Sequence, residues 1–187
     1  MSHKKVLVPL ATGFEEIEAV SIIDVLRRGE IEVIIAHIGE TKFVKGAHGI
    51  AIETDCDINT LSVDDIDMIV LPGGWDGTLA LINNAKVTEI LQDMDKKNKA
   101  IGAICAAPLA LHKAGVLKHN YTCYPSIEAE IRLDGYNDTA MVVEDDNVMT
   151  SKGPVTAMCF GLSIVKKLAG EEKYKTVKAG LLADYCL

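Results

Sequence analysis

One cysteine stands where a short apolar stretch gives way to a helical pattern. Residues 100–104 are small or β-branched, which is typical of a strand buried on both faces. Pro108 suits the first turn of a helix, where its missing N–H costs little. Because the N–H groups of a helix N-terminus favour an anion, this junction would stabilise a Cys105 thiolate. The pattern is that of a nucleophile elbow with Cys in place of Ser. The alternative is that Cys105 is a small buried hydrophobe.

Two further predicted strands end in residues that suit the same site. In a parallel doubly wound sheet, ligands bind beyond the carboxyl ends of the strands. One apolar strand ends in a Pro-Gly-Gly turn containing Gly73 and Gly74, whose backbone N–H groups could face an oxyanion. Taken alone, this turn is more simply explained as a tight loop. The first strand ends at Thr12-Gly13 and is followed by an acidic helix start. We therefore expect the three strand ends to meet at one edge of the sheet.

These strand ends belong to a chain in which strands alternate with helices. This alternation predicts one flavodoxin-like α/β domain over residues 1–187, with a doubly wound, mostly parallel sheet and helices on both faces. Strands are expected at 5–11, 32–38, 67–71 and 100–104, a hairpin at 42–52, an extended piece at 121–125, and strands at 137–143 and 147–151. Helices are expected at 14–28, 86–97, 155–169 and 172–183.

The helix expected at 14–28 has more apolar surface than one contact with a sheet requires. Its apolar residues are Ile17, Ala19, Val20, Ile22, Ile23, Val25 and Leu26. We therefore expect a homodimer in which this helix packs against its copy.

The composition excludes several classes of function. A net charge of −8 disfavours binding to nucleic acid or to an anionic membrane. No apolar run reaches the length of about 18 residues that a membrane span needs, and no signal peptide is visible. The five cysteines are widely spaced without a Cys-x-x-Cys pair, which indicates reduced thiols, a cytoplasmic location and neither a disulfide framework nor a metal site. No phosphate-cradling glycine motif follows a strand, so no cofactor is expected.

Four stretches together resemble the ThiJ/PfpI superfamily, and within it the parkinsonism-associated deglycase branch. They are Gly13-Phe14-Glu15-Glu16-Ile17-Glu18, Val70-Leu71-Pro72-Gly73-Gly74, Ala103-Ile104-Cys105-Ala106-Ala107-Pro108 and Thr150-Ser151-Lys152-Gly153-Pro154. The resemblance covers most of the chain and implies that Cys105 is the reactive cysteine. It also implies that Glu18 hydrogen-bonds the Cys105 sulfur, with backbone N–H groups of Gly74 and Ala106 around it. Further pocket candidates are Glu15, Gly73, Trp75, Tyr124 and Pro154.

Elementary chemistry constrains the role of Glu18. An ionised carboxylate beside Cys105 would raise the pKa of the thiol. The pair therefore works if Glu18 keeps its proton and donates it to sulfur, so that both groups titrate as one unit. The same hydrogen bond would stabilise a cysteine sulfinate. Glu16 is more simply explained as an exposed acid in the first helical turn.

The sequence departs from the family pattern at two positions. Ala107 stands where the family usually has Gly, and Tyr124-Pro125 stands where the branch often has His-Pro. With a pKa near 10, a tyrosine is a poor base at neutral pH. A mechanism that needs an imidazole at this place is therefore in question.

Three functions compete. In the first, Cys105 adds to a small aldehyde such as methylglyoxal, or acts on a glycated protein, and Glu18 moves protons on the way to a hydroxy acid. In the second, the protein is a non-catalytic oxidative-stress sensor or chaperone whose Cys105 becomes a sulfinate. The third, amidase or peptidase activity, is the remotest, because Ala106 follows the cysteine where those branches have His.

Overall fold

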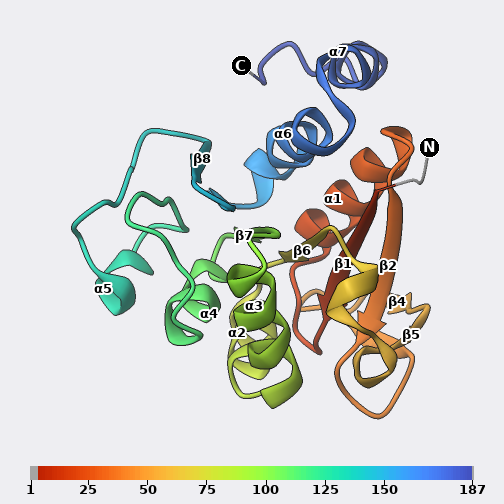
Figure 1. Cartoon of the computed structure of the whole chain (residues 1–187), viewed down its shortest axis with the longest axis vertical. Helices are drawn as coiled ribbons and strands as arrows, with labels where there is room; N and C mark the ends of the chain where they lie inside the picture. The colour runs from red at the N-terminus through yellow and green to blue at the C-terminus, as the bar shows by residue number, and fades with distance from the viewer. Residues whose placement is uncertain (1–3, 187) are drawn as a thin grey trace.

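A seven-stranded sheet forms the middle of this computed structural model, which describes residues 4–186 (Figure 1). Its strands are β1 (Lys5–Leu10), β2 (Glu32–His37), β5 (Cys56–Asp57), β6 (Met68–Leu71), β7 (Ala100–Ile104), β8 (Val142–Asp145) and β9 (Val148–Ser151). They lie in the order β5-β2-β1-β6-β7-β9-β8, and all neighbours are parallel except β8 and β9. The predicted mostly parallel sheet is confirmed. Residues 1–3 and 187 lie outside the described residues. The two ends of the predicted domain, and the prediction that no signal peptide is present, fall on them.

Helices cover both faces of the sheet (Figure 1). They are α1 (Glu16–Arg28), α2 (Trp75–Ile82), α3 (Ala85–Lys96), α4 (Pro108–Lys113), α5 (Glu128–Ile131), α6 (Ala157–Ala169) and α7 (Glu171–Gly180), with 3₁₀ turns η1 (Ile58–Thr60), η2 (Val63–Asp65) and η3 (Pro154–Thr156). One hydrophobic core lies between the sheet and α1 with α6, a second between the sheet and α3 with α4, and a smaller cluster around Tyr121 packs beside α4. Among the described residues, no helix has both the length and the apolar character needed to cross a membrane.

Alternation along the central strands explains why they are apolar on both faces. In β1, Val6 and Val8 enter the core beneath α1 and α6, whereas Leu7 enters the core beneath α3 and α4. All three side chains are fully buried. Strands that bury both faces in this way are expected in α/β proteins with helices on either side. The carboxyl ends of β1, β6 and β7 therefore stay at one edge, where the chain leaves the sheet.

The apolar circumference of α1 is covered in part by the chain itself. α1 packs against α6, and a Cβ on Gly161 of α6 would lie only 3.0 Å from the Val25 side chain of α1. The absence of a side chain at Gly161 thus lets the two helices approach closely. Ile17 and Val20 nevertheless remain about half exposed on the outer side of α1, at 58% and 49%.

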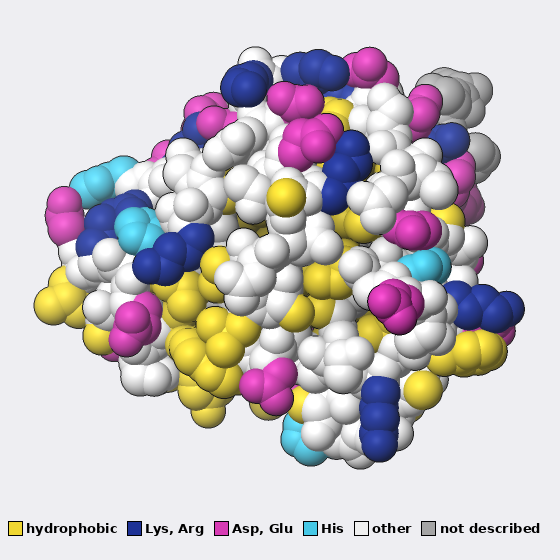
Figure 2. Space-filling model, turned by 90° about the horizontal axis from the view of Figure 1, so that it is seen from below, with side chains coloured by type: hydrophobic (Ala, Val, Ile, Leu, Met, Phe, Trp, Pro, Cys, Tyr) yellow, Lys and Arg dark blue, Asp and Glu magenta, His cyan; other side chains and the backbone are white. Residues whose placement is uncertain are grey.

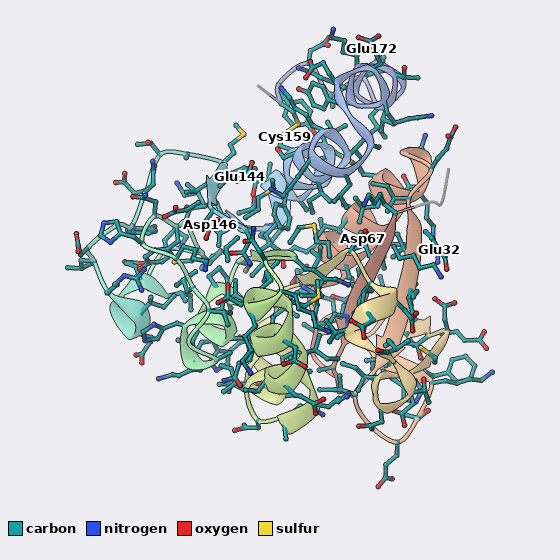
Figure 3. The ribbon with its side chains drawn as sticks, in the orientation of Figure 1. Glu32, Asp67, Glu144, Asp146, Cys159 and Glu172 are labelled. Carbon is teal, nitrogen blue, oxygen red and sulfur yellow. A yellow bond between two sulfur atoms is a disulfide. The ribbon has the colours of Figure 1, made fainter. Side chains whose placement is uncertain are left out.

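The prediction that all five cysteines are reduced was wrong. Cys159 on α6 and Cys186 form a disulfide, because α7 returns the C-terminal segment to α6 and leaves their Cα atoms 5.1 Å apart (Figure 3). The predicted cytoplasmic location loses the support of an all-reduced cysteine pattern.

The prediction of a strand over 137–143 was also wrong in its start, because the strand begins only at Val142. Before it, the Asn137 side chain accepts hydrogen bonds from the N–H groups of Thr139 and Ala140, which favours a turn.

A separate two-stranded hairpin lies beside the start of α1. It consists of β3 (Phe43–Lys45) and β4 (Ala51–Glu53), which pair antiparallel as the alternating pattern predicts. The N–H of Gly13 donates to the carbonyl of Lys45 at 2.8 Å, and the N–H of Ala47 donates to the carbonyl of Phe14 at 2.9 Å. The hairpin is therefore attached to the loop that leads from β1 into α1.

Candidate active site

Cys105 lies at a sharp turn between β7 and α4. Its φ of +64° falls in the left-handed region, which non-glycine residues rarely adopt and which persists only where the surroundings hold it. Here the N–H of Cys105 donates to the carbonyl of Ser151 at 3.0 Å, and its carbonyl accepts from the N–H of Tyr124 at 2.9 Å. Pro108 occupies the first turn of α4, as expected. The turn exposes the sulfur at the carboxyl edge of the sheet.

Gly73 and Gly74 allow the loop after β6 to approach the cysteine closely. A Cβ on Gly73 would lie 3.1 Å from the Cys105 sulfur and nearer still to its Cβ. Gly74 has a φ of +88°, and a Cβ there would collide with the carbonyl of Gly13 and lie 2.7 Å from the nitrogen of Glu15. Glycine is required at both positions because two loops and the cysteine meet there.

Two backbone donors point at the sulfur. The N–H groups of Gly74 and Ala106 hydrogen-bond to the Cys105 side chain and lower the pKa of its thiol. They come from different loops and are fixed by the backbone, so they need no reorganisation to meet a developing negative charge. An oxyanion formed on a carbon bonded to the sulfur would lie beside the same donors.

Glu18 lies behind the cysteine and is fully buried. Its Oε2 accepts the N–H of Gly73 at 2.7 Å, and its carboxyl is within hydrogen-bonding reach of the Cys105 side chain. Burial raises the pKa of Glu18 to about 7, and the charge of Glu15 adds to this rise, whereas the hydrogen bonds with Gly73 and Cys105 oppose it. Near neutral pH this carboxyl can therefore either hold or release a proton.

The protonation of Cys105 depends on that of Glu18. Burial and then the negative charge of Glu18 raise the pKa of the Cys105 thiol, against the two N–H donors. The expectation that the elbow lowers the thiol pKa is thus wrong, because burial and the charge of Glu18 outweigh the two N–H donors. A buried pair of acids accommodates one negative charge far more readily than two. The thiolate consequently forms in the state in which Glu18 keeps its proton.

A cavity of about 380 Å³ opens in front of Cys105. Sequence-predicted residues that line it are Glu15, Gly74, Trp75, Cys105, Ala106, Tyr124 and Pro154. Gly73 and Glu18 are not part of its wall and lie behind the cysteine. Figure 2 looks onto the edge of the sheet where its strands end, and the middle of this face is mostly hydrophobic and backbone surface. The structure thus brings the sequence-predicted site residues together around Cys105. Their catalytic roles remain predictions.

The cavity also contains two residues that the sequence reasoning missed, Ser126 and Ile127. Ser126 has a φ of +85°, a conformation that nothing in the local sequence indicates. Both follow the Tyr124-Pro125 pair, which was the only feature of this segment that pointed to the site in the sequence. Tyr124 is half exposed and its ring lies beside Gly153, where a Cβ would be 3.3 Å from Cδ2.

The expectation that Glu16 is an exposed acid was wrong. Glu16 is 5% exposed, and its carboxylate accepts hydrogen bonds from the N–H groups of His48 and Ile50 and from Nδ1 of His48. It joins the hairpin β3–β4 to the start of α1. Ligand atoms of Glu15, Glu16 and His48 lie within 4.8 Å of one another and could approach a metal ion. The hydrogen bonds of Glu16 account for its burial without one.

A match to a protein-family model identifies the family of this chain. The model of the DJ-1/PfpI family matches residues 4–167, which include β1, both glycines, Cys105 and the Gly153-Pro154 turn. The chain belongs to the DJ-1/PfpI family. The resemblance seen in four short stretches is therefore confirmed over nearly the whole domain.

Three members of the DJ-1/PfpI family match this chain over most of their own length. Protein dj-1beta of Drosophila melanogaster is 39% identical, and its crystal structure has a TM-score of 0.93, covering 97% of this chain and 98% of that one. The protein named glutathione-independent glyoxalase DJR-1.2 of Caenorhabditis elegans is 37% identical over 92% of this chain and 90% of its own. The protein named glutathione-independent glyoxalase DJ-1 of Schizosaccharomyces pombe is 32% identical over 95% and 97%.

Proposed function

We propose that this chain is a glutathione-independent glyoxalase that converts methylglyoxal and related α-oxoaldehydes to hydroxy acids, with removal of glycating adducts from proteins as a related use of the same chemistry. The observation that carries the proposal is the position of the Cys105 sulfur in an open cavity between Glu18 and two backbone donors. Two family members of similar length bear the glyoxalase name, which supports the reaction type.

The geometry suggests a sequence of three steps. The Cys105 thiolate adds to the aldehyde carbon, and the carbonyl electrons move to oxygen beside the N–H groups of Gly74 and Ala106. Glu18, returned to its ionised form as the hemithioacetal takes up its proton, removes the hydrogen on that carbon, which gives an enediol, and delivers it to the neighbouring carbon. The hydroxyl proton of the first carbon passes to the oxygen of the second, so that the first becomes a carbonyl and the second a hydroxyl. This isomerises the hemithioacetal to a hydroxyacyl thioester. Water then cleaves the thioester, which releases the hydroxy acid and restores the thiol.

The direct test is whether wild-type protein forms lactate from methylglyoxal without glutathione. We expect lactate to accumulate catalytically, and the intact mass of the protein to show a transient adduct on Cys105. Stoichiometric adduct formation without lactate, or no lactate above the buffer rate, would overturn the proposal.

Tyr124 should limit the rate where relatives have a histidine. A positioned acid–base group contributes about 10²–10⁴-fold, and a tyrosine supplies little of this near neutral pH. We expect Tyr124→His to raise kcat for methylglyoxal, and Tyr124→Phe to change it less than twofold. Steady-state kinetics on the three proteins measures this. A large loss in Tyr124→Phe would mean instead that the phenolic hydroxyl takes part.

We also propose that the protein is a homodimer formed through α1 and the hairpin β3–β4. Ile17 and Val20 on α1 and Phe43 and Ile50 on the hairpin are about half exposed, at 49–59%. The two elements adjoin, because Val20 and Ile52 line one shallow hollow. Isologous packing of such a surface on its copy would cover it.

Sedimentation at micromolar concentration should therefore show a species of twice the 20.2 kDa chain mass. Val20→Asp should shift the protein towards the monomer, since it would bury an unpaired charge in the interface. Leu133→Asp, at another residue that is 75% exposed, is the matched control and should leave the dimer intact. A monomeric wild type would exclude this dimer.

A second function, oxidant sensing, is favoured by one observation. Glu18 can hold a proton near neutral pH and is within hydrogen-bonding reach of the Cys105 side chain, so it could donate to an oxygen of a cysteine sulfinate. This function needs no turnover. If wild-type protein forms lactate no faster than a variant lacking the thiol, sensing is the function that remains.

A further inference from the structure

The wall of the cavity carries a negative charge and no matching cation. Glu15 is its only ionisable wall residue besides Cys105 and Tyr124, and none of the residues that line the described cavity is lysine, arginine or histidine. The Glu15 side chain is 13% exposed, and its backbone N–H donates to the carbonyl of Gly73 at 2.9 Å. The backbone of Glu15 is therefore held against the loop after β6, and its largely buried carboxylate lines the cavity, where water screens its charge less than at an open surface.

Neighbouring groups do not cancel this charge. His48 places Nδ1 3.6 Å from Glu15, but it lies closer to Glu16, at 2.9 Å, and its side chain is 70% exposed. A protonated His48 thus leaves a net negative charge on the three side chains. Glu18 lies behind the cysteine; burial is the main cause of its raised pKa, and the charge of Glu15 adds to this rise, so Glu15 is close enough to act on the acid of the site.

Apart from Ser126 and the backbone around the cysteine, the rest of the wall is mostly apolar. Trp75, Tyr124, Ile127 and Pro154 surround the opening, and Trp75 and Tyr124 are each half exposed. Such side chains favour a substrate with a hydrocarbon or aromatic substituent. An added carboxylate would meet Glu15 without a positively charged partner and would lose part of its hydration.

We propose, resting on the proposed function, that this pocket accepts uncharged α-oxoaldehydes with an apolar substituent and excludes carbonyl compounds that carry a carboxylate, with Glu15 as the residue that makes this choice. The same repulsion acts on the product. Hydrolysis of the thioester creates a carboxylate next to Glu15, and the hydroxy acid is driven out of the pocket. Glu15 thereby favours entry of a neutral substrate and release of an anionic product.

The test uses two alkylating agents of similar size, iodoacetamide and the anion iodoacetate. Rates of Cys105 modification are measured by peptide mass spectrometry, and the ratio of the two rates is compared with that of free glutathione. The ratio is informative because a change in the thiol pKa affects both reagents alike. We expect wild-type protein to prefer iodoacetamide about tenfold more strongly than glutathione does.

Glu15→Gln should bring this ratio close to that of glutathione. The substitution keeps the shape of the side chain, and Glu15 precedes α1 without a side-chain capping bond that would be lost. Glu32→Gln, at the amino end of β2, removes the same charge away from the cavity and should leave the ratio as in wild type. A wild-type ratio equal to that of glutathione, or a ratio unaltered in Glu15→Gln, would overturn the assignment.

Substrate kinetics then separate this inference from the proposed function. Phenylglyoxal and 4-carboxyphenylglyoxal differ only in the carboxylate, and their ratio of kcat/KM should fall about tenfold in Glu15→Gln. If no hydroxy acid forms from either compound while the alkylation ratio responds to Glu15→Gln, the glyoxalase proposal fails and charge selection at Cys105 stands. If both compounds turn over equally well in wild type, glyoxalase activity stands and charge selection fails.

Discussion

Replacing Cys105 by Ser should reduce lactate formation from methylglyoxal by about 10³-fold or more. The substitution changes one atom, so the turn, the two N–H donors and Glu18 stay in place. A serine hydroxyl, however, does not ionise under conditions in which a thiol does, and Glu18 with a pKa of about 7 is too weak a base to activate it. Lactate can be followed with a coupled assay or by proton NMR.

A second cysteine provides the matched control for this experiment. Cys56 is a free, partly buried thiol on β5 and does not line the cavity. Cys56→Ser should therefore retain wild-type turnover. Equal rates for wild type and Cys105→Ser would remove the nucleophile from the mechanism, and the enzymatic proposal with it.

Replacing Glu18 by Gln should lower kcat by about 10²–10⁴-fold. The amide oxygen of Gln can still accept the N–H of Gly73, but the side chain can no longer transfer a proton. In wild type, the reactive state has one proton on the pair, so kcat/KM should rise as the pH passes through about 7. Glu18→Gln should lose this inflection, which a pH–rate profile will show. An unchanged kcat in Glu18→Gln would exclude Glu18 as the acid–base group.

Stability measurements distinguish this chemical effect from misfolding. The folded state raises the pKa of Glu18 from 4.5 to about 7, so between these values it holds a proton that the unfolded chain has released. The free energy of unfolding should therefore decrease, by up to about 3 kcal/mol from this group, as the pH rises from about 4.5 to about 7. Glu18→Gln should remain folded and lack this decrease in urea or thermal unfolding.

The parts of the site that the sequence predicts are those determined by neighbouring residues. Residues 100–108 contain a buried strand, a cysteine and a proline for the first helical turn, and the structure places a strained turn there. The turn formed by the glycine pair after β6 is likewise predicted from its immediate neighbours in the sequence. In both cases the conformation follows from residue types within a few positions.

What the sequence did not reveal depends on contacts between distant segments. Glu16 is buried because the N–H groups of His48 and Ile50 reach it from a hairpin about thirty residues later. Cys159 meets Cys186 only because α7 folds back on α6. Likewise, the pKa of Cys105 is raised by burial of the thiol and then by the charge of Glu18, and the approach of α1 that brings Glu18 to the cysteine is specified by no local pattern.

The turn at Cys105 has a consequence for how this activity could be divided among pieces of the chain. Its conformation is held by Ser151 on β9 and by Tyr124, while Glu18 comes from α1. A fragment running from β6 to α4 would contain the thiol and both glycines but neither the acid nor the β9 anchor. Such a peptide is not expected to reproduce the site. Proteolytic cleavage between these segments should therefore abolish the reactivity of the thiol, even where Cys105 itself is intact.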